Sequence, residues 1–270
     1  MDRRWLPIAA LLLCACCLLC CAAFAEEFLV VDDSDEEAGI MTFPPPTPSP
    51  TPTPAPTPTP TPGPLDALTV VTFGSYEQDG DESDGAEPIE WYVIARDGRY
   101  GLLLSRYALE CRAYEPSYGS TSWEESPLRH WLNSTFVRGS FTQREKAAIR
   151  RVSVRNGRDQ DLWDTRASTV YTRDDVFLLS YKEATGTYFV REELLLCLPT
   201  AHALTRGAIA HDEEGHCWWW SRSPGHKAFE ATVFLEDGSV EYCDVNNTYV
   251  GVRPAMWVDL TNSLFAGMLE

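Results

Sequence analysis

The chain has 270 residues, of which 44% are hydrophobic, and it carries 40 acidic against 22 basic side chains, a formal net charge of −18 at pH 7. This excess of negative charge repels phosphate backbones and anionic membrane surfaces. The composition therefore argues against a nucleic-acid partner, and we expect contact with a membrane only through the N-terminal leader or a lipid attached to it.

Residues 1–25 have the pattern of a secretory signal peptide. A basic pair is followed by an apolar run over residues 5–23, and Ala23-Phe24-Ala25 supplies the small residues that a signal peptidase reads. We expect cleavage after Ala25, which gives an extracellular or cell-surface protein. Two alternatives stay open: the run is nearly long enough to remain as a membrane anchor, and Leu13-Cys14-Ala15-Cys16 resembles a bacterial lipobox in which Cys16 would be acylated.

Two segments without a predicted fold separate the leader from the rest of the chain. Residues 26–43 hold seven acidic and no basic side chains, so we expect them to be disordered. Residues 44–64 are rich in alternating Thr and Pro, which removes backbone N–H donors and fixes φ, so this tract is predicted to be an extended polyproline II linker. At about 3.1 Å per residue it would form a stalk on the order of 65 Å long.

Residues 65–270 hold all but one of the nine Trp residues and are predicted to form a single domain. Its first elements are strands. Apolar, β-rich runs at residues 68–73, 89–94 and 100–104 are punctuated by Asp-Gly turns, which predicts an opening antiparallel sheet.

Short helices are predicted in the middle of the domain. Ser126-Pro127 has the residue types of an N-cap and a first helical position. Thr142 to Glu145 is a capping box that opens a helix through Ile149, and Ser180 to Glu183 is a second capping box directly after a predicted strand at residues 176–179.

A hairpin is predicted over Ala231–Val245. Asp237-Gly238 is typical of a two-residue type I′ turn, which would pair Leu235 with Val240. Strands first, short helices in the middle and strands again at the end describe an α+β domain with antiparallel sheets.

Four cysteines remain once the leader is removed, and an even number in an exported protein permits two disulfides in any of three connectivities. Sequence alone does not choose among them. We favour Cys217 with Cys243, because both flank one β-rich unit, and Cys111 with Cys197. The alternative is that all four are buried free thiols, since a domain of this size does not need disulfides to fold.

Several strings in this domain resemble one family. They are Phe73-Gly74-Ser75-Tyr76, Pro88-Ile89-Glu90-Trp91, Leu103-Leu104-Ser105, Val176-Phe177-Leu178-Leu179-Ser180, Leu198-Pro199-Thr200-Ala201, Trp219-Trp220-Ser221-Arg222-Ser223-Pro224-Gly225 and Gly251-Val252-Arg253-Pro254-Ala255. As a set they resemble the bacterial domain of unknown function six-two-seven-three, over nearly all of residues 68–260.

That family in turn looks like the C-type-lectin-like fold of formylglycine-generating enzymes and of variable ligand-binding proteins of bacteria and phages. The resemblance implies a compact α+β domain whose terminal strands pair and whose irregular loops present a binding surface, usually without catalysis. No catalytic residue is carried over, because the spacing of Cys197, Cys217 and Cys243 does not reproduce the copper-binding cysteine pair of those enzymes.

The densest aromatic cluster predicts where a ligand would bind. On a strand, Trp218 and Trp220 would share one face, and Arg222 with His226 would add polar contacts, so these four residues form the ligand-binding hypothesis. The alternative is that the tryptophans pack in the core.

Three further residues are assigned structural roles. Trp91 and Trp131 are expected in the core, and Arg253 is expected to be a partly buried guanidinium paired with a carboxylate.

No sequence pattern predicts a cofactor or a catalytic centre. The cluster from His211 to Cys217 has an i, i+5 His spacing beside Gly215 that does not preform a metal site, and the acidic turn at residues 79–85 has Asp84 where a calcium loop requires Gly. Nucleophile elbows, zinc-protease motifs and phosphate loops are missing from the sequence.

We therefore expect a displayed, non-catalytic recognition domain whose ligand is a carbohydrate or another protein at the cell surface. Two alternatives are an envelope enzyme acting on wall polymers and a structural envelope protein without a discrete ligand.

Overall fold

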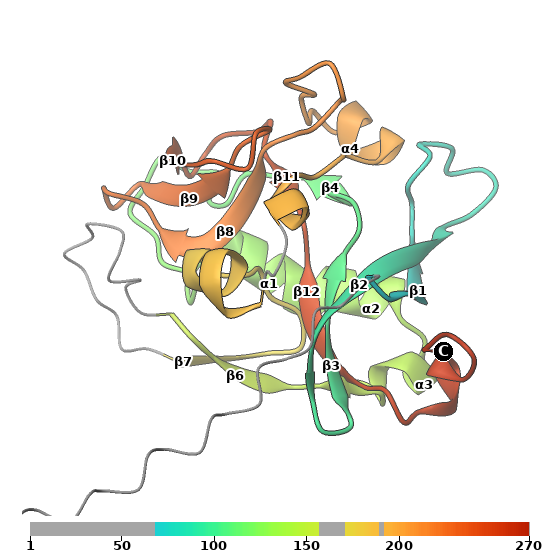
Figure 1. Cartoon of the computed structure of the whole chain (residues 1–270). Coiled ribbons are helices and arrows are strands. Elements are labelled where there is room, and N and C mark those ends of the chain that lie inside the picture. The colour runs from blue at the N-terminus through green and yellow to red at the C-terminus, as the bar shows by residue number, and fades with distance from the viewer. Residues whose placement is uncertain (1–67, 157–170, 189–191, 270) are drawn as a thin grey trace, which may run out of the picture. The chain divides into compact units, whose positions relative to one another are not determined.

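A computed structural model describes residues 68–156, 171–188 and 192–269 (Figure 1). The described residues belong to one compact unit, Pro60–Glu270. The predictions for the leader, the acidic segment and the Thr/Pro linker lie outside the described residues. Within the described part, no helix has the length and apolar character needed to cross a membrane.

The first sheet contains the predicted opening strands. β1 (Val70–Tyr76), β2 (Glu87–Asp97) and β3 (Tyr100–Ser105) form an antiparallel meander, and β12 (Ala255–Asp259) and β5 (Ile149–Arg150) extend it in the order β1-β2-β3-β12-β5. The expected pairing of the terminal strands is wrong, because β2 and β3 lie between β1 and β12.

The second sheet is built mainly from the C-terminal third of the chain, which is coloured orange to red in Figure 1. β8 (Trp219–Pro224), β9 (Glu230–Phe234), β10 (Val240–Asp244), β11 (Gly251–Val252) and β4 (Glu110–Cys111) take the order β10-β9-β8-β11-β4. Only the β11–β8 pair in this sheet is parallel. A separate two-stranded ladder joins β6 (Val152–Arg155) to β7 (Tyr171–Asp174). The predicted α+β class is confirmed.

The helices are short. The α-helices are α1 (Pro127–Trp131), α2 (Val137–Ser140), α3 (Gln143–Lys146) and α4 (Ala201–Thr205). Single turns of π-helix cover Leu132–Phe136 and Glu183–Thr187, and turns of 3₁₀-helix cover Glu192–Leu195 and Ser263–Phe265.

The predicted helix starts are confirmed. The Ser126 hydroxyl accepts the Arg129 N–H at 3.1 Å ahead of Pro127, and Thr142 forms a reciprocal capping box with Glu145. The helix ends differ from the prediction. α3 stops at Lys146, because Ile149 pairs with Val258 as a strand residue.

Two predicted β features are also different in the structure. The strand expected at residues 176–179 is reduced to one bridge between Phe177 and Ala255. In the C-terminal hairpin, Val240 pairs with Phe234 and not with Leu235, a shift of one residue. The Gly238 N–H bonds to the Leu235 carbonyl and Gly238 has φ +80°, so a type I turn followed by a left-handed glycine closes a three-residue loop in place of the predicted type I′ turn.

The two sheets share one hydrophobic core. Trp91 is fully buried in it and donates its indole N–H to the Phe73 carbonyl at 2.7 Å. Trp219 and Trp220 are both fully buried, although successive strand residues face opposite sides. Their strand β8 lies between β9 and β11, and it is covered on both faces.

Candidate ligand pocket

Arg253 lies where the chain passes from one sheet to the other. β11 ends at Val252 in the second sheet, and β12 begins at Ala255 in the first. Pro254 has no N–H to pair, and its carbonyl accepts the Ser105 N–H at 2.9 Å, which fixes the crossing to the end of β3. The Arg253 side chain is thereby placed between the sheets and is only 1% exposed.

The guanidinium of Arg253 is held by backbone carbonyls. Its Nε donates to Ser105 O at 3.0 Å, and its Nη1 donates to Leu194 O at 2.6 Å and Leu196 O at 3.2 Å. The guanidinium also lies 5.1 Å from the ring centroid of Trp219. No carboxylate of the described residues forms an ion pair with Arg253, so the predicted carboxylate partner is not found among them.

A pocket of about 240 Å³ opens beside Arg253. Its walls come from five separate parts of the chain: β2, the segment after β3, the 3₁₀ turn with the residues that follow it, the loop before β8, and the crossing from β11 to β12. The lining residues are Tyr92, Arg106, Tyr107, Glu193, Leu196, Leu198, His216 and Arg253. We call this site the Arg253 pocket. Its volume is below the roughly 300–1,000 Å³ of sites for drug-sized ligands, so it suits one sugar ring or a group of that size.

The two arginines of the pocket differ in charge balance. Arg106 is ion-paired with Glu90 at 2.8 Å and lies 5.3 Å from the ring centroid of Tyr107. Arg253 has only neutral carbonyls as hydrogen-bond acceptors, and its Nη2 group makes no hydrogen bond to the described residues. Of these two arginines, only Arg253 has no ion-paired carboxylate among the described residues.

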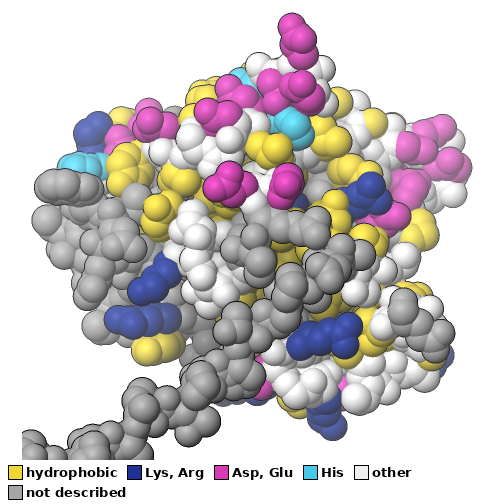
Figure 2. All heavy atoms as spheres, in the orientation of Figure 1, with side chains coloured by type: hydrophobic (Ala, Val, Ile, Leu, Met, Phe, Trp, Pro, Cys, Tyr) yellow, Lys and Arg dark blue, Asp and Glu magenta, His cyan; other side chains and the backbone are white. Residues whose placement is uncertain are grey.

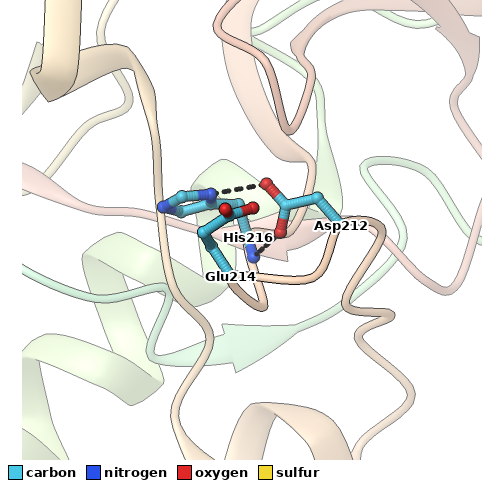
Figure 3. A group of neighbouring side chains, drawn as sticks. All are labelled: Asp212, Glu214 and His216. Atoms are coloured by element: carbon cyan, nitrogen blue, oxygen red, sulfur yellow. Dashed lines mark hydrogen bonds and ion pairs between the residues drawn. The ribbon is translucent and has the colours of Figure 1, made fainter.

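His216 is fixed at the pocket by its own loop. Ala210 and Cys217 form an antiparallel bridge, and the His211 N–H donates to the His216 carbonyl at 2.8 Å. Asp212 accepts the His216 backbone N–H and contacts ring Nδ1, both at 2.6 Å. Figure 3 shows this pair and the other ring nitrogen, which points away from Asp212.

The Asp212 carboxylate is a strong acceptor for this histidine. Partial burial alone would raise the pKa of Asp212, but the hydrogen bonds and charge of His216 lower it below its usual range. An ionised Asp212 favours the His216 tautomer with its proton on Nδ1, which leaves Nε2 as an acceptor in the neutral ring.

Asp212, Glu214 and His216 also bring ligand atoms within 4.8 Å of one another, an arrangement that metal ions can use (Figure 3). The spacing of the two histidines in this loop predicted no metal site, and these three residues were not predicted to lie together. A metal bound here would have to displace the hydrogen bond between Asp212 and His216. We therefore assign the loop to the positioning of His216.

The surface around this loop is acidic. Figure 2 shows Asp and Glu side chains gathered along the upper edge of the face drawn, where Figure 1 places the loop between α4 and β8 and the turn between β1 and β2. Glu213 and Glu214 are exposed in the first of these segments, and residues 79–84 in the second. The loop that carries His216 to the pocket is thus part of this acidic surface.

The four residues of the sequence-based binding hypothesis do not form one surface. Trp220 is fully buried and donates its indole N–H to Arg112 O at 2.9 Å. Arg222 is 3% exposed. Trp218 is half-buried and stacks on His211 with ring centroids 4.6 Å apart, while His226 is exposed. Trp220 and Arg222 therefore take structural positions.

Arg222 has the carboxylate partner that was expected for Arg253. Its Nη1 and Nη2 contact both carboxylate oxygens of Glu183, with Nη2 to Oε1 at 2.7 Å, and Nη1 also donates to Leu178 O at 2.7 Å. This bidentate pair joins β8 to the turn that begins at Ser180.

The remaining structural prediction concerns Trp131. This residue is half-buried, and the guanidinium of Arg112 lies 4.8 Å from its ring centroid.

Asp174 and Asp175, at the end of β7, are both paired with arginines. Asp174 accepts the Arg129 guanidinium at 2.7 Å and the Trp123 indole N–H at 3.0 Å. Asp175 pairs with Arg151, whose Nε lies 2.9 Å from Oδ1. Both aspartates stabilise the β7 region through these contacts.

Sequence reasoning missed Tyr92, Arg106, Tyr107 and His216 as members of one site. They are far apart in the chain, and no local periodicity links them. Three of the strings that carry the family resemblance contain or adjoin residues of this site: those with Ser105, Leu198 and Arg253.

The comparisons with known proteins identify a family and no individual relative. A family model described as "Domain of unknown function (DUF6273)" matches residues 100–260. Neither a curated protein nor a solved structure matches the chain.

Proposed function

The chain belongs to the DUF6273 family, whose model covers more than half of its 270 residues, and we propose that it is an exported recognition domain. This domain would bind an acidic carbohydrate in the Arg253 pocket without transforming it. The proposal keeps the displayed, non-catalytic function expected from the sequence. It moves the binding site from the Trp218 to His226 segment to the pocket.

The single observation that carries the proposal is that Arg253 is buried with no ion-paired carboxylate among the described residues. A buried charge is costly unless it is paired or fully hydrogen-bonded. The described residues give Arg253 three carbonyl acceptors and one aromatic ring, but no anion. A carboxylate on the ligand would supply the missing charge, and the planar guanidinium is suited to bind it through two hydrogen bonds.

The other lining residues favour a sugar. Tyr92 and Tyr107 offer rings on which the apolar face of a sugar can stack. The exposed Glu193 and the fixed ring of His216 can bind hydroxyl groups. A pocket of about 240 Å³ holds one such ring, so the ligand would be a carboxylated sugar unit or the end of a chain that carries one.

The acidic surface near His216 narrows the class of ligand that we expect to bind. Repulsion between exposed charges is screened beyond roughly 8 Å at physiological ionic strength. A sugar with a single carboxylate can therefore reach Arg253, whereas a polyanion would place several charges against the acidic surface. We expect selection for singly acidic sugars over polyanions.

The leader and the Thr/Pro linker support display outside the cell: a cleaved signal peptide or an acylated Cys16 would export the domain, and the stalk would hold it away from its attachment point. We also propose a C-type-lectin-like fold. The mostly antiparallel sheets and few short helices support it, whereas the pairing of β12 with β3 in place of β1 does not.

Isothermal titration calorimetry on the full chain tests the function with a matched pair of ligands, methyl glucuronide and methyl glucoside. These differ by a carboxylate in place of a hydroxymethyl group. We expect the glucuronide to bind at least about tenfold more tightly, since a charged hydrogen-bond pair contributes about 1.5–3 kcal/mol. Equal affinities, or binding of neither sugar, would contradict the proposal. Turnover of a wall polymer would favour the enzyme alternative, and binding of a peptide in place of both sugars would favour a protein ligand.

A further inference from the structure

Cys197 and Cys217 lie side by side in the core. The Cys217 N–H donates to the Cys197 carbonyl at 2.8 Å, and the two side chains are 0–1% exposed. The Cys197 thiol lies 3.6 Å from the Leu198 carbonyl. All four cysteines of the described domain are free thiols in the structure.

The sheet order separates the other cysteines. Cys111 is on β4 and Cys243 is on β10, at opposite edges of the second sheet. Neighbouring strands are about 4.8 Å apart, so four strand spacings keep these two roughly 19 Å from each other. A disulfide needs Cα atoms within about 7 Å.

The pairings favoured from the sequence do not fit this arrangement. Cys217 leads into β8, and β9 separates β8 from the strand that carries Cys243. The Cys111 thiol lies against the carbonyls of Thr248, at 3.1 Å, and Val250. The backbone contact between Cys197 and Cys217, in contrast, holds their Cα atoms at a separation that a disulfide can span.

We propose that Cys197 and Cys217 form a disulfide when the chain folds in an oxidising compartment. The presence of the oxidant rests on the export that the proposed function includes. The pairing itself rests only on the geometry above.

The reaction is a thiol–disulfide exchange with a low-molecular-weight disulfide such as oxidised glutathione. One cysteine thiolate attacks the oxidant, which forms a mixed disulfide and releases one glutathione thiolate. The second cysteine loses its proton and attacks the sulfur of the first, which releases the second glutathione. The two protein thiols are oxidised and one glutathione disulfide is reduced. Since both side chains are buried, we place this exchange during folding.

The bond would join two walls of the Arg253 pocket. Leu196 and Leu198, which flank Cys197, line one wall, and His216, which precedes Cys217, lines another. A bond between these segments would restrain both walls of the pocket before a ligand binds. Such restraint reduces the ordering cost of binding.

Disulfide mapping of the chain after removal of the leader, residues 26–270, tests the proposal, because residues 1–25 carry five further cysteines. The protein is refolded with oxidised and reduced glutathione, free thiols are alkylated, and the non-reduced digest is analysed by mass spectrometry. We expect one linked peptide pair that contains Cys197 and Cys217, with Cys111 and Cys243 alkylated. Alkylation of both Cys197 and Cys217, or a link from either to another cysteine, would overturn the proposal. The mapping requires no ligand, so its outcome is independent of the sugar titration.

Thermal unfolding of variants gives a second readout. Reduction of the wild-type protein should lower Tm by on the order of 10 °C, because the bond closes a loop of about 20 residues. Cys197→Ser and Cys217→Ser should each abolish this shift on reduction. Cys243→Ser, at another buried thiol, should keep it. A shift that survives in Cys197→Ser, or is lost in Cys243→Ser, would contradict the assignment.

Discussion

Two buried arginines, Arg222 and Arg253, show how similar burial can serve different purposes. Both are at most 3% exposed, and both donate to backbone carbonyls. Arg222 also pairs with Glu183, whereas Arg253 has no ion-paired carboxylate among the described residues and faces a pocket. Burial alone therefore does not distinguish a structural arginine from a binding one. The charge balance around it does.

The largest effect should come from breaking the Arg222 pair. Glu183→Gln leaves Arg222 buried without its anion, and we expect the free energy of unfolding to fall by about 3 kcal/mol. Urea denaturation measures it. Glu193→Gln is the matched control, because Glu193 is exposed in the Arg253 pocket; its effect should stay within about 0.5 kcal/mol. Similar losses in the two variants would remove the distinction between the two arginines.

A medium effect is expected when charge is added at the pocket. Leu198 lines it and is 39% exposed, while Leu204 is 45% exposed on α4 and is not among the lining residues. Leu198→Glu should weaken glucuronide binding by about tenfold through repulsion of the carboxylate. Leu204→Glu should leave it unchanged. Calorimetry distinguishes them, and equal affinities in the two variants would place the acidic sugar elsewhere.

The smallest effect concerns the thiol of Cys197, whose neighbours Leu196 and Leu198 line the pocket. Burial alone would raise the pKa of Cys197, but the hydrogen bond from the Cys217 thiol and the charge of Arg253 lower it. In the reduced protein, raising the pH through this pKa creates a thiolate near Arg253, which competes with the acidic ligand.

Glucuronide affinity of the reduced protein should therefore fall severalfold between about pH 6 and about pH 9, a range that spans the lowered thiol pKa. The oxidised protein has no such thiolate and should show a flatter profile. A fall of the same size in Cys197→Ser under reducing conditions would refute this explanation.

Local chemistry predicted local structure well. Ser126, Thr142 and Ser180 begin helical turns as expected, since a capping side chain and its backbone partner are only three residues apart. The predicted register of the hairpin differs from the observed register by one residue. The sequence Asp237-Gly238 fits both a type I′ turn and a type I turn with a left-handed glycine, and the pairing of whole strands decides between them.

The site was less predictable because it is made by long-range contacts. Trp220 belongs to a central strand whose two faces are both covered, which a single strand sequence does not reveal. The exchange of roles between Arg222 and Arg253 depends on where Glu183 lies, 39 residues from Arg222 in the chain. Cys197 and Cys217 become neighbours only through the folding of the segment between them.

We propose that the charge of Arg253, and not that of Arg222, is available to an acidic ligand. Nuclear magnetic resonance of the ¹⁵N-labelled full chain tests it directly, through the guanidinium Nε–H signals of the two arginines during a titration with methyl glucuronide. We expect the Arg253 signal to shift and saturate while the Arg222 signal stays in place. A shift of the Arg222 signal alone, or no change in either signal at saturating ligand, would contradict it.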